Sequence, residues 1–426
     1  MSKFVASIPN PQLTNSNTGT YATNQGLVKD SLGNLYYVTM AQLGQVDPVT
    51  QPSLMIYKST DSGHTWTIIV SDSNRGTDGG FGVSIVADVL FLCIVNSIIA
   101  PNSHLGMYQY NTTTNTFAAD DYGGPAPNNA LNGFLAQTSL SDGTIGMAYV
   151  SQVAGVTFNK PQYVTWKAGV WSAPINLADG TNQLLPQWIV KEVATDRVHV
   201  FLYEGSPTAV TDSGIWHISA ETDGTLHTLQ NPIVATPNIN NICGPIGAPC
   251  IFGADTQIEL PYVFGAVGNF TPGVSSLRVL RGTVAANPVW TDEQAVPANF
   301  LANNDLEPFL GLGYFIVSAV NVSGGITIFF GVDNNEIRGI GNNIQSFLYT
   351  VSTTATVAGW GTPALLFTAP FPSAFSSPYA LPTSASASGV VIGTIAVTGD
   401  TPQYGDLRLF FIGSDAERVK TCLGES

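Results

Sequence analysis

The sequence has few charged residues, few cysteines and no long apolar run. Charged residues make up 10% of the 426 residues, against roughly 25% in an average globular domain. An apolar 3.6-residue period nowhere persists beyond a turn or two, which argues against long amphipathic helices. Four cysteines are too few for a disulfide framework. No stretch reaches the roughly 18 consecutive apolar residues that cross a bilayer as a helix.

Basic residues are the scarcer charge. The chain has 14 Lys and Arg against 29 Asp and Glu, for a net charge of −15. Such a surface repels phosphate backbones and anionic headgroups, so we expect neither nucleic-acid binding nor membrane insertion. The first residues lack the apolar segment of a secretory signal. We therefore expect synthesis in the cytoplasm without a signal peptide, with a virion or the extracellular space as destinations after release.

Turn-forming residues are abundant. The chain contains 43 Gly and 26 Pro, and hydrophobic residues make up 44%. Many short apolar segments separated by Gly and Pro predict an all-β protein built from short strands and tight turns. The length exceeds that of an ordinary single domain. A closed repeat fold is the common exception, because each repeat adds its own part of the core.

One eight-residue segment, Ser59 to Trp66, reads STDSGHTW. We expect a hairpin turn in which the Asp61 carboxylate accepts backbone N–H groups and Gly63 adopts a positive φ. The Ser59 and Thr65 hydroxyls would bond across the turn, and Trp66 would pack between sheets. The segment resembles the Asp box of the sialidase-like (BNR) superfamily of β-propellers. That resemblance implies a propeller and places the box on its rim, away from an active site.

A related pattern recurs along the chain. Residues 57–66 read YKSTDSGHTW and residues 108–117 read YQYNTTTNTF, so the first tyrosine and the closing aromatic residue are both displaced by 51 positions. Later hairpins also end in an aromatic or apolar residue. The closing positions are Trp66, Phe117, Trp171, Leu226, Trp290 and Trp360. Their spacings of 51, 54, 55, 64 and 70 residues fit one four-stranded antiparallel blade with variable loops.

The repeats predict a single β-propeller domain over residues 1–426, with seven blades, or six if the last segment is only a cap. The predicted blades cover residues 20–72, 75–122, 130–178, 182–235, 245–297, 305–369 and 377–416. The last segment supplies three strands, at residues 378–386, 389–397 and 406–412. Residues 3–8 form one apolar strand without a blade. We expect this strand to pair beside residues 406–412, which closes the ring and covers both sheet edges.

The resemblance also defines what sialidase chemistry would require. Members of that family hold a sugar carboxylate with three arginines, and they use a tyrosine nucleophile. Their first arginine precedes an Ile-Pro pair, where this chain has Ser7. Tyr404 begins only a four-residue match to the tyrosine segment. The seven arginines all follow the first Asp box: Arg75, Arg197, Arg278, Arg281, Arg338, Arg408 and Arg418. We therefore expect no sialidase activity and assign no catalytic residue.

Other glycoside hydrolases need two carboxylates that face each other across the substrate. Several loop carboxylates are eligible, although solvated turn residues are the simpler interpretation. They are Asp72, Asp78, Asp120, Asp121, Asp305, Glu307, Asp333 and Glu336.

A calcium loop is the one metal site that the sequence suggests. Asp72, Asn74 and Asp78 place side-chain oxygens at positions 1, 3 and 7 of such a loop. Position 5 is Gly76 and no glutamate stands at position 12, so a plain turn is the preferred interpretation. The five histidines show no zinc-site spacing. We expect no cofactor, with Ca²⁺ at residues 72–78 as the open alternative.

Two functions remain open on this basis. The preferred one is a non-catalytic recognition or structural module, such as a virion appendage or a lectin without a signal peptide. Its Asn, Thr, Ser and Gly loops with interspersed aromatics would bind a glycan or a protein partner. The alternative is a glycoside hydrolase of the sialidase-like superfamily that acts in the central funnel. The missing arginine set favours the first.

Overall fold

The computed structural model describes 31 β-strands, β1 to β31. The described residues are 3–8, 26–40, 53–77, 80–96, 104–127, 135–151, 160–178, 184–204, 214–235, 241–247, 249–252, 256–266, 276–297, 300, 306–307, 316–320, 326–334, 346–353, 359–368, 373–375, 390–396 and 407–414. Within these ranges, no helix has the length and hydropathy needed to cross a membrane.

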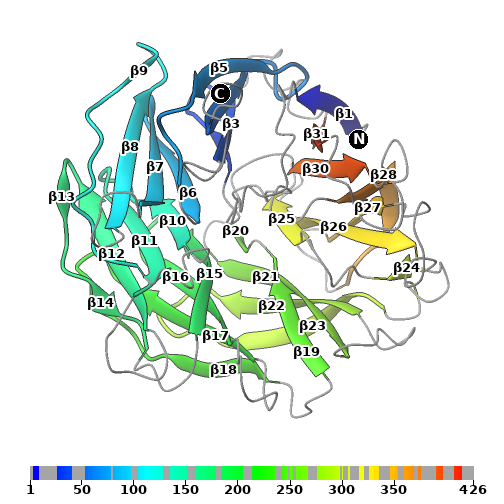
Figure 1. Cartoon of the computed structure of the whole chain (residues 1–426). Coiled ribbons are helices and arrows are strands. Elements are labelled where there is room, and N and C mark those ends of the chain that lie inside the picture. The colour runs from blue at the N-terminus through cyan, green and yellow to red at the C-terminus, as the bar shows by residue number, and fades with distance from the viewer. Residues whose placement is uncertain are drawn as a thin grey trace.

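The strands pair into seven antiparallel sheets arranged around a common centre (Figure 1). The first sheet contains β2 (Leu27–Lys29), β3 (Leu35–Met40), β4 (Leu54–Ser59) and β5 (Thr67–Asp72). The second contains β6 (Phe81–Val86), β7 (Val89–Asn96), β8 (His104–Asn111) and β9 (Thr116–Phe117). The third contains β10 (Leu135–Ser139), β11 (Ile145–Val150), β12 (Pro161–Lys167), β13 (Val170–Trp171) and β14 (Ile175–Asn176). The fourth contains β15 (Leu184–Lys191), β16 (Val198–Glu204), β17 (Gly214–Ala220) and β18 (Gln230–Ala235).

The remaining three sheets use the C-terminal half of the chain. The fifth contains β19 (Asn241–Ile246), β20 (Cys250–Phe252), β21 (Gln257–Ala266), β22 (Ser276–Thr283) and β23 (Trp290–Val296). The sixth contains β24 (Leu306–Glu307), β25 (Ile316–Val320), β26 (Ile326–Asn334), β27 (Ser346–Ser352) and β28 (Ala364–Thr368). The seventh contains β1 (Lys3–Ile8), β29 (Ser373–Phe375), β30 (Val390–Ala396) and β31 (Leu407–Ser414). The predicted all-β propeller is confirmed.

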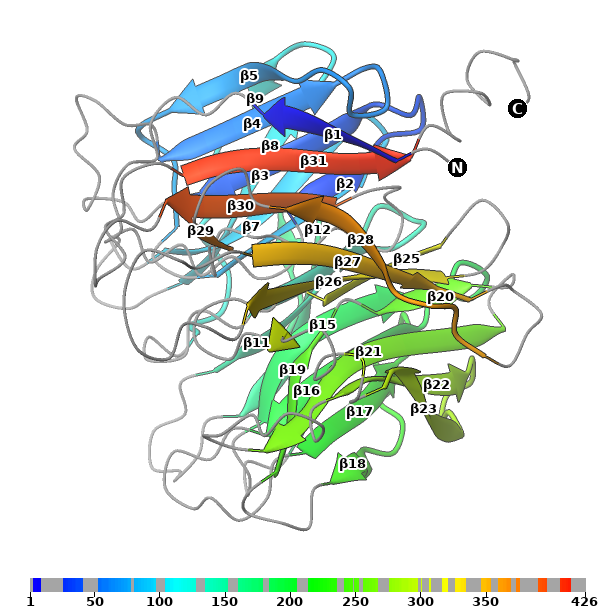
Figure 2. The same cartoon turned by 90° about the vertical axis from the view of Figure 1, so that its right-hand side faces the viewer.

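The two ends of the described chain meet in the seventh sheet. Strand β1 pairs antiparallel with β31, from Lys3 opposite Ser414 to Ile8 opposite Leu409, and the two strands lie side by side in Figures 1 and 2. The expected pairing of residues 3–8 with residues 406–412 is therefore observed. This pairing covers one long edge of β31, whose other edge pairs with β30. A ring closed in this way leaves fewer exposed strand edges.

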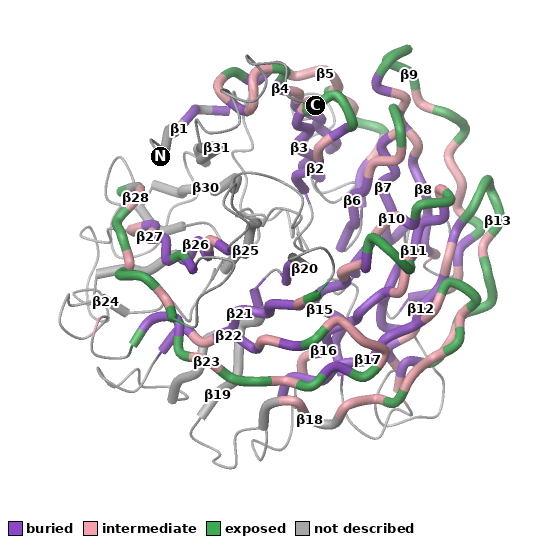
Figure 3. Tube along the Cα trace, turned by 180° about the vertical axis from the view of Figure 1, so that it is seen from behind, coloured by how far each residue is buried: buried purple, intermediate pink, exposed green. Residues whose placement is uncertain are grey.

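Burial follows the position of a strand in its sheet (Figure 3). Every residue of β3 and of β11 is buried, because these second strands are covered on both faces by neighbouring sheets. The outermost strand β5 has only exposed and half-buried residues. The apolar segments of the sequence therefore form the inner strands, and the more polar segments form the outer strands at the rim.

The predicted closing residues lie in or shortly before the outer strands, and two of the tryptophans contact the preceding sheet. The indole N–H of Trp171 donates to Asp121 Oδ2 at 3.2 Å, and that of Trp360 donates to Glu293 Oε2 at 3.3 Å. In each case the acceptor belongs to the outer part of the preceding sheet. We call such a contact between the outer parts of consecutive sheets a seam.

Two inner strands differ from the sequence-based expectation. The inner strand of the seventh sheet is β29, which precedes the expected residues 378–386; those residues lie outside the described ranges. In the fifth sheet, β19 and β20 pair with successive parts of β21, with a register shift between Cys243 and Ile246. The fifth sheet thus begins at Asn241, ahead of the predicted residue 245, because its inner edge is built from two segments.

Candidate functional site

The ring has two unlike ends. In the first four sheets, short turns link the first strand to the second and the third to the fourth, so all of them lie at one end, the short-turn end. Longer connections between the second and third strands lie at the opposite, long-connection end. Long loops on a rigid scaffold are where binding and catalytic residues gather. Most of these connections lie outside the described residues, but the strand ends beside them are described.

The segment Ser59–Trp66 forms the turn between β4 and β5, at the short-turn end. Asp61 Oδ1 accepts the backbone N–H of Thr65 at 2.9 Å, and Oδ2 accepts the Thr65 hydroxyl at 2.7 Å. The Ser59 hydroxyl donates to Asp61 at 2.8 Å and accepts the N–H of Gly63 at 2.8 Å. Burial opposes ionisation of Asp61, yet these hydrogen bonds hold its carboxyl pKa below the ordinary value. Trp66 Nε1 donates to the Gly63 carbonyl at 2.9 Å.

The same turn packs against the seventh sheet. The Trp66 and Phe411 rings lie 5.4 Å apart, and both side chains are buried. Gly63 has φ +93, and a Cβ atom there would lie 2.0 Å from Phe411 Cε1. The side chains of Ser59, Asp61, Thr65 and Trp66 are hydrogen-bonded within the turn, and the turn packs on Phe411, so the observed geometry is that of a fastening.

The suggested calcium ligands are only partly described. Asp72 Oδ1 accepts the N–H of Asn74 at 2.7 Å, and Oδ2 binds Arg75 at 2.7 Å. Asp78 lies outside the described residues. Across the part of the chain that the structure describes, no group of three or more His, Cys, Asp or Glu could hold a metal ion. The Ca²⁺ alternative stays a prediction.

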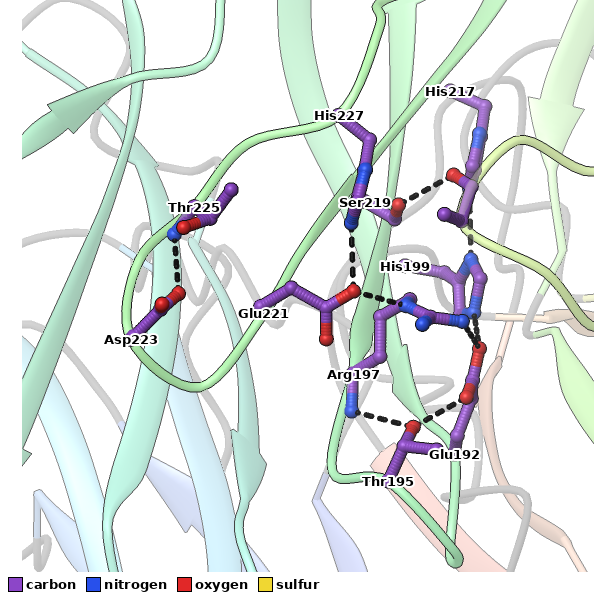
Figure 4. Close-up of polar contacts among 11 residues, drawn as sticks. Glu192, Thr195, Arg197, His199, His217, Ser219, Glu221, Asp223, Thr225 and His227 are labelled. Carbon is purple, nitrogen blue, oxygen red and sulfur yellow. Dashed lines mark hydrogen bonds and ion pairs between the residues drawn. The ribbon is translucent and has the colours of Figure 1, made fainter.

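A buried polar network crosses the fourth sheet at the short-turn end (Figure 4). His199 Nε2 lies 2.8 Å from Glu192 Oε1, and His199 Nδ1 lies 3.0 Å from His217 Nε2. Both imidazoles are fully buried, and Glu192 is 2% exposed. Burial opposes ionisation of Glu192, but hydrogen bonds from His199 and Thr195, with the nearby Arg197 charge, lower its pKa to about 2. Burial holds the pKa of His217 well below the ordinary histidine value.

Arg197 connects this network to the surface. Its Nη1 contacts Glu192 Oε1 at 3.0 Å and its Nε contacts Glu221 Oε1 at 2.7 Å. The same oxygen of Glu221 lies 2.7 Å from His227 Nε2. Metal-site spacings among the histidines do not reveal this network. The available signal was a histidine inside each of two apolar strands, VHVFLYE and GIWHISA.

A second buried carboxylate lies in the fifth sheet. Glu259 is fully buried, and its Oε1 is bound by Arg281 Nε at 2.5 Å. Among the residues that the structure describes, its Oε2 has no hydrogen-bond partner. Burial raises the pKa of Glu259 to about 7, although the Arg281 guanidinium opposes the shift. Arg281 also binds Glu293 at 2.8 Å.

The long-connection end carries one histidine with a defined tautomer. His104 begins β8 and is half-buried, and its Nδ1 lies 3.0 Å from the carbonyl oxygen of Gly124. A carbonyl oxygen can only accept, so Nδ1 carries the proton and donates. In the neutral ring Nε2 then holds the lone pair. A histidine fixed in this way can act as a general base through Nε2.

The eligible carboxylates Asp72, Asp120 and Asp121 are engaged with cations or indoles. Arg75 Nε contacts Asp120 at 3.0 Å in addition to its contact with Asp72, and its guanidinium lies 4.2 Å above the Phe117 ring. Asp121 Oδ2 accepts the indole N–H of Trp166 at 2.7 Å. Of the other eligible carboxylates, the side chains of Glu307 and Asp333 are not described, and three residues lie outside the described ranges: Asp78, Asp305 and Glu336.

Each of the four arginines whose side chain is described is held by carboxylates. Arg278 binds Asp292 at 2.7 Å, and Arg75, Arg197 and Arg281 each contact two acidic residues. The structure does not bring these four together. The side chain of Arg408 is not described, and the remaining sialidase-type candidates, Arg338, Arg418 and Tyr404, lie outside the described ranges.

The whole chain resembles solved β-propeller enzymes in fold. A polysaccharide lyase of family PL25, an ulvan lyase, superposes with a TM-score of 0.57 at 10% identity, over 97% of this chain and 97% of that one. The same lyase bound to -[GlcA(1-4)Rha3S]- gives a TM-score of 0.54 at 10% identity, over 98% and 97%. An α-L-arabinanase from Penicillium chrysogenum gives 0.47 at 11% identity, over 97% and 99%. No family model matches the chain, and no curated protein matches its sequence.

These comparisons correct the preferred interpretation of the sequence. A non-catalytic recognition or structural module was expected, whereas the propellers that share this fold along their full length are enzymes that act on glycans. The alternative, a glycoside hydrolase, has the better support in its coarser form, a glycan-active enzyme. The comparisons support the β-propeller and do not single out the sialidase-like superfamily.

Proposed function

We propose that the chain is a glycan-active enzyme that cleaves a polysaccharide at the long-connection end of the ring. The observation that carries the proposal is the full-length similarity to an ulvan lyase, with 97% of both chains covered. The fold alone does not fix an activity, so residues must supply the chemistry. The local resemblance of the turn at Ser59–Trp66 to an Asp box supports a rim fastening and is not extended to sialidase chemistry.

His104 is the residue that supports a cleavage step. Its Nδ1–H is committed to the Gly124 carbonyl, which leaves Nε2 to take a proton. In β-elimination, a base removes the proton on the carbon next to a uronate carboxylate. The bond to the glycosidic oxygen at the adjacent ring carbon then breaks, and a proton goes to the departing oxygen. The product carries a new carbon–carbon double bond, and no water is consumed.

A two-readout assay tests the enzyme class. The chain is incubated with ulvan and other uronate polysaccharides, and with neutral polysaccharides such as arabinan. New reducing ends report any cleavage, and ultraviolet absorbance of the double bond reports elimination. We expect both signals from a uronate polysaccharide. Reducing ends without absorbance would assign hydrolysis instead, and no product from any polysaccharide would contradict the proposal.

Substitution of His104 tests its role separately from the enzyme class. His104→Asn keeps an amide N–H close to the Nδ1 position that donates to the Gly124 carbonyl, but it cannot act as a base. We expect turnover to fall about 10²–10⁴-fold with an unchanged melting temperature. His227→Gln, at the short-turn end, is the control and should retain full turnover. Full turnover of His104→Asn would remove His104 from the mechanism.

A further inference from the structure

The buried histidines of the fourth sheet form a continuous hydrogen-bonded chain from Glu192 to the seam with the fifth sheet. Beyond His199, the chain continues from His217 Nδ1 to Gln230 Oε1 at 2.8 Å. The same Gln230 oxygen accepts the indole N–H of Trp290, from the next sheet, at 2.9 Å. Figure 4 shows the contacts of the two imidazoles with each other and with Glu192. Every step of this chain has an assignable donor, so its protons can be counted.

The hydrogen bonds of Gln230 determine whether His217 Nδ1 carries a proton. Its Oε1 faces the Trp290 indole, which can only donate. Its Nε2 lies 2.8 Å from the carbonyl oxygen of Pro288, which can only accept. The amide orientation is therefore determined from both sides. Because Oε1 is an acceptor, His217 Nδ1 must carry a proton and donate it.

The contacts of Glu192 determine whether His199 Nε2 carries a proton. Its Oε1 also accepts from Arg197 Nη1 at 3.0 Å, and its Oε2 accepts the Thr195 hydroxyl. Two donors and a guanidinium charge on one carboxyl group favour its ionised form. An ionised carboxylate has only acceptors, so His199 Nε2 must carry a proton. The two outer nitrogens of the histidine pair are thus both protonated.

The contact between the two rings needs a third proton. His199 Nδ1 and His217 Nε2 lie 3.0 Å apart, and without a proton between them two lone pairs would face each other. Three protons on four nitrogens give the pair one positive charge. The count therefore follows from the heavy-atom contacts.

We propose that this singly charged histidine pair is a proton-dependent lock on the seam between the fourth and fifth sheets. While the shared proton is present, every group from Glu192 to Trp290 is paired. Its loss leaves one of three contacts without a donor: His199 Nε2 with Glu192, His199 Nδ1 with His217 Nε2, or His217 Nδ1 with Gln230 Oε1. Each of these repulsions disrupts the chain that attaches Gln230, and with it the hydrogen bond to Trp290. Alkaline conditions thus loosen this seam.

The charges around the pair are balanced by named groups. Arg197 lies between Glu192 and Glu221, and His227 faces Glu221. Nearer the strand ends, Lys191 pairs with Asp196 at 3.0 Å. From the fifth sheet the pair meets Trp290, whose ring lies 5.3 Å from that of His217. Within the described contacts, Glu192 is the one carboxylate that touches the pair directly.

Nuclear magnetic resonance of the folded chain tests the proton count directly. With ¹⁵N-labelled histidine at about pH 8, above the ordinary histidine pKa of about 6.5, we expect one fully buried ring with both nitrogens protonated. We expect a second buried ring protonated at Nδ1 only. Two neutral rings at this pH would overturn the proposal, whatever the behaviour of any variant.

Gln230→Leu tests the proton count in a variant that keeps both histidines. It removes Gln230 Oε1, the acceptor that requires a proton on His217 Nδ1. Unfolding the parent at about pH 8 should release about one proton more than unfolding this variant. His227→Gln is the control and should release as many protons as the parent. The measurement lies above the pKa of about 7 at Glu259, so that carboxyl does not contribute. Equal release by the parent and Gln230→Leu would contradict the lock.

Discussion

Trp290 reaches across a seam and donates its indole N–H to Gln230 Oε1 at 2.9 Å. Trp171 reaches Asp121 and Trp360 reaches Glu293 in the same way. Each acceptor stands three or four positions after the closing residue of its own sheet, at Phe117, Leu226 and Trp290. In these three seams the closing tryptophan of one sheet supplies the donor. A residue three or four positions after the closing residue of the preceding sheet supplies the acceptor.

The first prediction concerns Asp121, which accepts two indole N–H groups through Oδ2. Asp121→Ala leaves Trp166, which is buried, and Trp171 without their acceptor. An unsatisfied buried donor costs about 1–3 kcal/mol, so we expect a loss of about 2–3 kcal/mol in the free energy of unfolding. Urea unfolding measures it. The control is Asp223→Ala, in an exposed turn, which should change stability far less. Equal losses of unfolding free energy in the two variants would show that the indole contacts of Asp121 do not stabilise the fold.

The second prediction compares two glycines with similar backbones and different surroundings. Gly63 has φ +93 with Phe411 at 2.0 Å from a built Cβ, whereas Gly33 has φ +86 with nothing within 4 Å. Gly33→Ala should lower the free energy of unfolding by roughly 1–2 kcal/mol, because an alanine at positive φ strains the backbone. Gly63→Ala must also displace a buried ring, so its melting temperature should fall several degrees further. If the two alanine variants have the same melting temperature, the turn at Ser59–Trp66 is not held against the seventh sheet.

The turn at Ser59–Trp66 and the propeller could be predicted from sequence because the turn is a local signal and the propeller is a repeated one. The hydrogen bonds of Asp61 join residues at most four positions apart, and the repeats set the approximate limits of each sheet. The pairing of β1 with β31 was also predictable, since an apolar strand and an incomplete sheet need each other.

The histidine pair could not be predicted in the same way. His199 and His217 meet because β16 and β17 pair with His199 opposite Ser219 and His217 opposite Phe201, and a shift of one residue would turn one ring to the other face. The register depends on how the two strands pair, and the sequence of neither strand alone determines it. Arg281 and Glu259 face each other for the same reason, through the register of β21 and β22.

The last prediction concerns the pH dependence of stability at Glu259. Its pKa is about 7 in the folded protein, against 4.5 for an ordinary glutamate. The folded chain therefore binds this proton more tightly than the unfolded chain does. Between about pH 4.5 and about pH 7, stability falls as pH rises, by an amount on the order of 3 kcal/mol in total. Above that range the carboxylate is ionised in both states, and its contribution no longer changes.

Glu259→Gln removes the titration and supplies an amide in place of the unpartnered oxygen. Urea unfolding at a series of pH values should show a parent-minus-variant difference that declines between about pH 4.5 and about pH 7 and is flat above. Glu221→Gln is the control, because hydrogen bonds from Arg197 and His227 outweigh burial and hold the Glu221 pKa below the ordinary value. Its difference from the parent should change only on the acidic side of that range. A difference for Glu259→Gln that stays constant from acid to neutral pH would show that the carboxyl is ionised throughout, with its second oxygen satisfied.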